Sequence, residues 1–193
     1  MDSFLNTNYF AKLGIRLDPG LSDSEISAVE SKYKFVFPPD LRQLLQFGLP
    51  IGNRFVDWRN GKPEEIQERM EWPYEGICFD IENNNFWLDE WGEKPVNLDD
   101  RFMIAKRYIN SAPILIPIYS HRYIPDSPNE TGNPIFSVYQ TDIIVYGSTL
   151  ESYLKNEFGN FASRENLSSL LGEKRIDFWS HLVDLNNGIV DAI

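Results

Sequence analysis

The sequence has few of the residues from which redox, metal or histidine-based reaction centres are built. It contains one cysteine, Cys78, and two histidines, His121 and His181, among 193 residues. One cysteine cannot form a disulfide within the chain, and two histidines cannot supply a histidine-rich metal site. We therefore expect Cys78 to be a small buried residue, and we expect neither a metal ion nor another cofactor.

Long apolar runs are also missing. No stretch is long enough to span a bilayer, and the first residues, MDSFLNTNYFAKLG, have neither a basic start nor the apolar centre of a secretory signal. Together with the single cysteine, these features predict a cytoplasmic protein. The length predicts one domain, 1–193, with its own hydrophobic core.

Signatures of common reaction centres are missing as well. The chain has no glycine-rich phosphate loop, nucleophile elbow or paired-histidine zinc motif. Ser120 precedes His121, but neighbours on a strand point to opposite faces, so we expect no nucleophile–base pair there. We interpret the protein as non-enzymatic. The alternative is a carboxylate-dependent enzyme that uses His121 with acids of the middle region, namely Asp80, Glu82, Asp89 or Glu90.

Negative charge is concentrated in the middle of the chain. The formal net charge is −11, and residues 57–100 hold 13 acids against 4 bases together with four of the five tryptophans. Such a field repels nucleic acids and anionic membranes and attracts cationic surfaces. The alternative is a solubilising surface around a tryptophan-rich core.

The stretch NNNFWLDEWGEKP, residues 83–95, places indoles beside carboxylates. Tryptophan supplies anchoring area and acids select a cationic partner, so this composition favours a contact surface. We expect Trp87 to bury one face and Trp91 to be partly exposed, although a purely structural role is the alternative. The predicted partner-binding residues are Asp57, Trp58, Trp87, Asp89, Glu90, Trp91, His121 and Arg122.

Helical patterns occur at both ends of the chain. Ser22 and Glu25 have the spacing of a capping box, and Leu21 and Ile26 that of a hydrophobic staple. Further helices are predicted over 37–50, ended by Gly48, and over 98–113, with Asp99 as the cap. The others are expected over 61–73, bounded by two prolines, and over 149–158, 163–172 and 175–188.

Strand patterns occupy the middle. In GICFDIENNNFWL, residues 76–88, the apolar residues Ile77, Phe79 and Ile81 alternate, which predicts a strand, a turn and a second strand. Residues 113–124 are rich in β-formers, and Pro117 places them at an edge or a bulge. Residues 133–147 predict a hairpin around Gln140 and Thr141, and 124–134 a polar loop. Helices flanking paired strands indicate an α+β domain.

Four segments, in this order and spacing, resemble the SUKH superfamily. They are LSDSEISAVESKYKFVFPPDLRQLLQFGLP, FWLDEWGEKP, APILIPIYSHRYIP and NPIFSVYQTDIIVYGSTLESYLKNEF. The resemblance covers about residues 20–158, with 159–193 as a helical extension. It implies a single, predominantly antiparallel sheet packed against helices. FGLPIGN stands where a pair of glycines is frequent in the family, so the turn there departs from the common pattern.

The resemblance also implies a function. Many bacterial members of the superfamily are immunity proteins that neutralise toxins, so the chain is expected to be an immunity or antitoxin-like protein. It would bind a basic toxin domain, such as a nuclease, and occlude its active site. The alternative is an intracellular regulatory scaffold similar to the cell-wall-assembly regulator of yeast.

Overall fold

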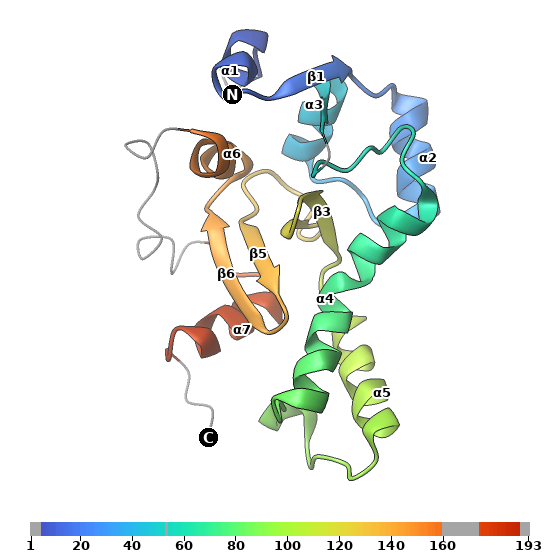
Figure 1. Cartoon of the computed structure of the whole chain (residues 1–193), viewed down its shortest axis with the longest axis vertical. Coiled ribbons are helices and arrows are strands. Elements are labelled where there is room, and N and C mark those ends of the chain that lie inside the picture. Colours follow the sequence, from blue (N-terminus) through green and yellow to red (C-terminus); the bar gives the residue numbers. More distant parts are fainter. Residues whose placement is uncertain (1–4, 53, 160–173, 190–193) are drawn as a thin grey trace.

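The computed structural model describes residues 5–52, 54–159 and 174–189 (Figure 1). Its N-terminal part combines short helices with a two-stranded antiparallel sheet formed by β1 and β2. The elements of this part are α1 (Thr7–Lys12), β1 (Arg16–Pro19), α2 (Asp23–Tyr33), α3 (Pro39–Phe47) and β2 (Gly48–Ile51). The helix predicted over 37–50 is present as α3 and ends at Phe47, and a strand starts at Gly48.

The predicted capping box at the start of α2 is confirmed. The Glu25 N–H donates to Ser22 Oγ at 3.3 Å, and the Ser22 N–H donates to the Glu25 carboxylate at 2.8 Å. Leu21 and Ile26 are both buried, as the staple requires. These contacts satisfy backbone donors that the first turn of a helix leaves without partners.

One long helix, α4 (Pro63–Asn83), replaces the predicted short helix and the strand after it. The strand prediction was wrong because the helix continues through Pro73, a residue that usually ends or kinks a helix. Ile77 and Ile81 are four residues apart, so they lie on one helical face and are buried, whereas Phe79 between them is exposed. The apparent alternation was therefore a helical stripe. Cys78, expected to be buried, is half-buried on this helix.

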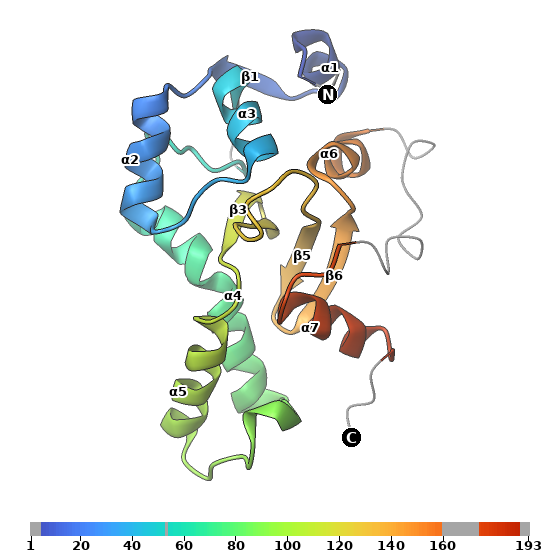
Figure 2. The ribbon, with the colours of Figure 1, turned by 180° about the vertical axis from the view of Figure 1, so that it is seen from behind.

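After α4 the chain passes through the short helix η1 (Asp89–Trp91) to α5 (Leu98–Ile109), which packs beside α4 in both views (Figures 1 and 2). The expected helix is confirmed, but its cap is Asn97 rather than Asp99. Asn97 Oδ1 accepts a hydrogen bond from the Asp99 N–H at 2.8 Å. An asparagine side chain in this position caps the helix as well as aspartate does.

The main sheet is antiparallel, with strand order β3-β4-β5-β6. Its strands are β3 (Leu115–Tyr119), β4 (Arg122–Pro125), β5 (Ile135–Tyr139) and β6 (Asp142–Gly147). Pro117 lies on the edge strand β3, where the register shifts, and Gln140 and Thr141 form the β5–β6 turn, as predicted. The α+β class is confirmed, with the β1–β2 sheet as an addition to the expected single sheet.

Hydrophobic clusters cover both faces of the main sheet. Ile116, Ile118 and Ile124 belong to a cluster with the N-terminal helices and α6 (Leu150–Phe158). Tyr123 and Phe136 belong to a second cluster, which contains residues of α4, α5 and α7 (Trp179–Asn186). The predicted helices over 149–158 and 175–188 are thereby confirmed, and the one over 163–172 lies outside the described residues. Figure 2 shows α6 and α7 at opposite ends of β6.

The C-terminal half of α4 is fastened to the tip of the β5–β6 hairpin. Asp80 is only 4% exposed, and its Oδ2 accepts hydrogen bonds from the N–H and the Oγ1 of Thr141, at 2.8 and 2.6 Å. One turn earlier, a Cβ on Gly76 would lie 2.7 Å from the Cα of Gln140. Glycine is therefore needed for this close approach of two backbones.

Gly76→Ala tests this contact. Alanine in a helix interior normally stabilises a protein by about 1 kcal/mol relative to glycine. Here the added methyl group meets backbone atoms, so we expect the free energy of unfolding in urea to fall by about 1–3 kcal/mol. The control is Glu71→Ala on the exposed face of α4, expected to stay within about 0.5 kcal/mol of wild type. Stabilisation by Gly76→Ala would refute the close approach.

Candidate functional site

Three of the predicted partner-binding residues are buried. Trp58 packs edge-on against Phe35 and Phe37, and Trp91, only 4% exposed, stacks on Tyr108. The expected exposure of Trp91 was wrong because the indole packs inward at the end of η1. Both rings therefore belong to the hydrophobic core and are not available to a partner.

The third buried residue among those predicted to bind a partner is Arg122. Its Nε donates to the Glu157 carboxylate at 2.9 Å, one terminal nitrogen donates to Ser137 Oγ, and the guanidinium lies over the Tyr146 ring. A buried arginine with these partners joins α6 to the sheet. Its role is therefore internal packing, and its position on a β-strand offered no sign of this.

The remaining predicted residues are accessible but lie apart. Asp57 is exposed just before α4, whereas Asp89 and Glu90 are exposed after its end, beside the half-buried Trp87. A helix of 21 residues is about 30 Å long, so the two groups lie at opposite ends of α4 (Figure 1). Half-buried His121 lies elsewhere, on the β3–β4 turn. The predicted residues do not form one surface.

A groove of about 840 Å³ lies between α4 and one end of the main sheet. The helix contributes Glu65, Glu68, Arg69, Trp72 and Glu75, and the sheet contributes Ser120, His121, Tyr123 and Tyr139. Positions 65, 68, 72 and 75 recur every three or four residues, so they share one face of α4. We call this feature the α4 groove. Of the predicted residues, His121 lines it.

The α4 groove is acidic and carries two accessible aromatic rings. Glu65, Glu68 and Glu75 are exposed, while Trp72 is 45% and Tyr139 57% exposed. Arg69 directs one terminal nitrogen to the Arg54 carbonyl at 2.9 Å, and the buried Tyr123 hydroxyl donates to the Arg69 carbonyl. Carboxylates around an accessible indole suit a cationic side chain, which gains both charge attraction and contact with the ring face.

Ser120 and His121 do contact each other, contrary to expectation. Ser120 Oγ lies 3.2 Å from His121 Nδ1, because both residues belong to a turn, where Ser120 has a φ of 50°, and not to a strand. A nucleophile–base pair also needs a third group that orients the base. Within the described residues His121 Nε2 has no hydrogen-bonding partner. The contact alone therefore assigns no reaction.

The acids considered as an alternative reaction centre do not converge. Asp80 is buried on α4 and bonded to Thr141, and Glu82, two residues later, points to another side of the same helix. The described part of the chain contains no group of three His, Cys, Asp or Glu side chains that could hold a metal ion. Among the described helices, none combines the length and apolar character needed to cross a membrane.

Sequence reasoning missed Trp72 and Tyr139. The signal was present, because Trp72 stands seven residues after Glu65, four after Glu68 and three before Glu75. This spacing was overlooked because the helix was predicted to end at Pro73, so Glu75 was expected to lie outside the helix. No pattern in the sequence shows that Tyr139 would face these residues, since that depends on how α4 packs on the sheet.

In comparisons with known proteins, no protein-family model, curated protein or solved structure matches the chain. A function is therefore inferred from the groove itself, together with the resemblance in the sequence.

The pKa of His121 provides a test of the groove. Burial, followed by the positive charge of Arg122, lowers the pKa below the ordinary value of 6.5. Because the unfolded chain then binds the proton more tightly, the contribution of His121 to stability is complete above pH 6.5 and is lost as the pH falls through the folded-state pKa. We expect an NMR titration of the ring to give a value below 6.5.

His121→Gln should flatten this part of the pH dependence of unfolding, whereas His181→Gln should leave the titration of His121 unchanged. A His121 pKa at or above 6.5 would contradict the described burial of the ring.

Proposed function

We propose that the chain is a non-enzymatic binding protein of the immunity type, whose α4 groove holds a basic segment of a toxin domain and occludes it. The observation that carries this proposal is the face of α4 on which Glu65, Glu68 and Glu75 surround Trp72. Tyr139 and His121 form the opposite wall.

The chemistry of the groove favours a cationic protein segment. Exposed carboxylates attract lysine and arginine from a distance and raise the association rate. A tryptophan that is accessible in a concave site is the kind of residue on which binding energy concentrates. A cation over the indole adds about 0.5–2 kcal/mol, depending on how far it is desolvated.

A basic toxin domain fits these properties. A nuclease needs positive charge to hold phosphates, so an acidic groove can occupy its substrate site by carrying similar charge. Residues 57–100, which include α4, hold 13 acids and 4 bases, so the helix that forms one wall of the groove belongs to a strongly acidic part of the chain. The resemblance of four segments to the SUKH superfamily supports the same class of partner.

The first test replaces the aromatic anchor. The probe is the product of the adjacent upstream gene, where the proposal places the toxin, and binding is measured by calorimetry. Trp72→Ala should raise Kd about thirtyfold, which corresponds to about 2 kcal/mol for an anchor residue. Trp87→Ala is the matched control and should change Kd less than threefold. Equal losses of affinity in the two variants would show that the α4 groove is not the interface.

The second test reverses charge in the groove. Glu68→Lys with Glu75→Lys should weaken binding and flatten its dependence on salt, because fewer opposite charges attract the partner. Glu82→Lys with Glu93→Lys changes the net charge equally at exposed sites outside the groove and should keep the wild-type slope. Cells that lack this protein and survive an intact toxin would overturn the immunity role.

A further inference from the structure

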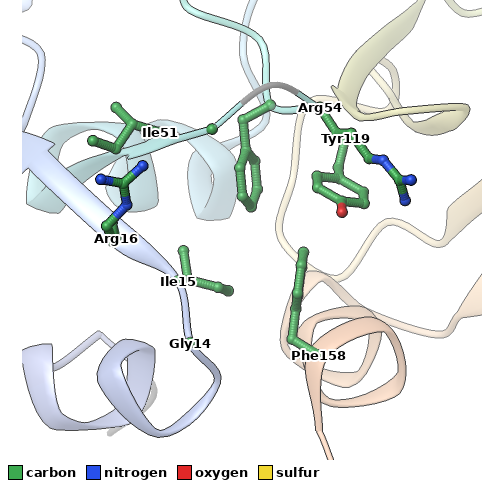
Figure 3. Close-up of a pocket in the computed structure, with 9 residues that line it drawn as sticks. Gly14, Ile15, Arg16, Ile51, Arg54, Tyr119 and Phe158 are labelled. Atoms are coloured by element: carbon green, nitrogen blue, oxygen red, sulfur yellow. The ribbon is translucent and has the colours of Figure 1, made fainter.

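A second hollow, of about 410 Å³, lies on the other side of the β3–β4 turn from the α4 groove. It is formed where β1 and β2 approach the ends of β3 and α6 (Figure 3). The lining residues are Gly14, Ile15, Arg16, Ile51, Gly52, Arg54, Phe55, Tyr119 and Phe158. We call it the aromatic pocket. Its size is within the range of pockets that hold small molecules.

Three aromatic rings contact one another in this pocket. The ring of Phe55 lies 4.8 Å from that of Tyr119 and 5.6 Å from that of Phe158, and the last two are 5.0 Å apart, measured between centroids. All three side chains are only half-buried. An isolated β-bridge between Phe55 and Tyr119 fixes two of them. Clustered rings that remain accessible offer a rigid surface against which another ring can pack.

Two arginines give the aromatic pocket a positive charge. Arg16 and Arg54 are exposed and stand on its two sides (Figure 3). In the described part of the chain no carboxylate lies within 4.0 Å of either guanidinium group. The other described arginines have partners. Four pair with acids, namely Arg42, Arg59, Arg122 and Arg175. Arg69 and Arg101 donate to backbone carbonyls, and Arg107 lies over the Tyr108 ring.

This arrangement is unusual for a chain of net charge −11. Among the described residues these two guanidinium groups have no acidic partner, so they leave an anion site open beside the hollow. Guanidinium groups bind carboxylate and phosphate through paired hydrogen bonds, and they do so more strongly than neutral donors. A ligand for this pocket therefore needs a negative group for the arginines and a flat apolar body for the rings.

We propose that the aromatic pocket binds a small planar anion, an aromatic ring that carries one carboxylate or phosphate group. The ring packs against Phe55, Tyr119 and Phe158, and the anionic group is held by Arg16 or Arg54. A cationic ligand is disfavoured by the same two charges. This site does not depend on the proposed function, since it shares no lining residue with the α4 groove.

The test uses the full chain and defined probes. Titration with 2-naphthoate, followed by amide NMR signals, should shift Gly14, Gly52 and Tyr119 in a saturable manner. The neutral isostere 2-naphthylmethanol should bind at least tenfold more weakly, and acetate, which has no ring, should not saturate. A parallel titration with 2-naphthyl phosphate shows whether the pocket prefers a carboxylate or a phosphate group, because the preferred anion gives the lower Kd.

Substitutions distinguish binding at the aromatic pocket from a general affinity of the chain for anions. Arg16→Gln with Arg54→Gln should weaken 2-naphthoate at least tenfold, whereas Lys32→Gln with Arg107→Gln, which removes equal charge elsewhere, should not. Glu68→Lys with Glu75→Lys should bind the probe as wild type does, so failure of the partner interaction would leave this result intact. Equal affinity for the neutral isostere, or undiminished binding by the Arg16/Arg54 variant in a folded protein, would overturn the proposal.

Discussion

The candidate site depends on one interaction, the docking of α4 on the tip of the β5–β6 hairpin. The buried carboxylate of Asp80 accepts two hydrogen bonds from Thr141, and Gly76 allows the helix backbone to approach Gln140. A buried carboxylate requires such partners, because burial without them is costly. The same turn follows Tyr139 directly. One contact therefore fixes the rotation of α4 and places Tyr139 opposite the face that carries Trp72 and the three glutamates.

Local signals predicted much of the fold, and interactions between distant segments explain where prediction failed. The Ser22 capping box, the edge position of Pro117 and the turn at Gln140 follow from chemistry within a few residues, and all three are confirmed. The continuation of α4 past Pro73 is different, because its C-terminal half is stabilised by contacts with the sheet. Tertiary packing overrode a local preference there. The burial of Trp91 has the same cause, since α5 supplies Tyr108 as its stacking partner.

The two hollows have opposite charge and meet at the β3–β4 turn. Tyr119 lines the aromatic pocket, whereas Ser120 and His121 line the α4 groove. The turn is anchored by the Arg54 carbonyl, which accepts hydrogen bonds from the Ser120 N–H at 2.8 Å and from Arg69 at 2.9 Å. The Arg54 carbonyl thus supports the walls of both the aromatic pocket and the α4 groove. An acidic groove and an arginine-lined pocket therefore lie side by side in an acidic chain.

The most direct measurement of the central claim is side-chain footprinting by hydroxyl radicals, with and without the proposed toxin partner. Trp72 and Tyr139 are both exposed on the α4 groove, and half-buried Trp87 lies beyond the far end of the helix. If the groove holds the partner, oxidation of Trp72 and Tyr139 slows several-fold in the complex while that of Trp87 is unchanged. Protection of Trp87 with no change at Trp72 would contradict the account and would place the interface at residues 83–95, as the sequence predicted.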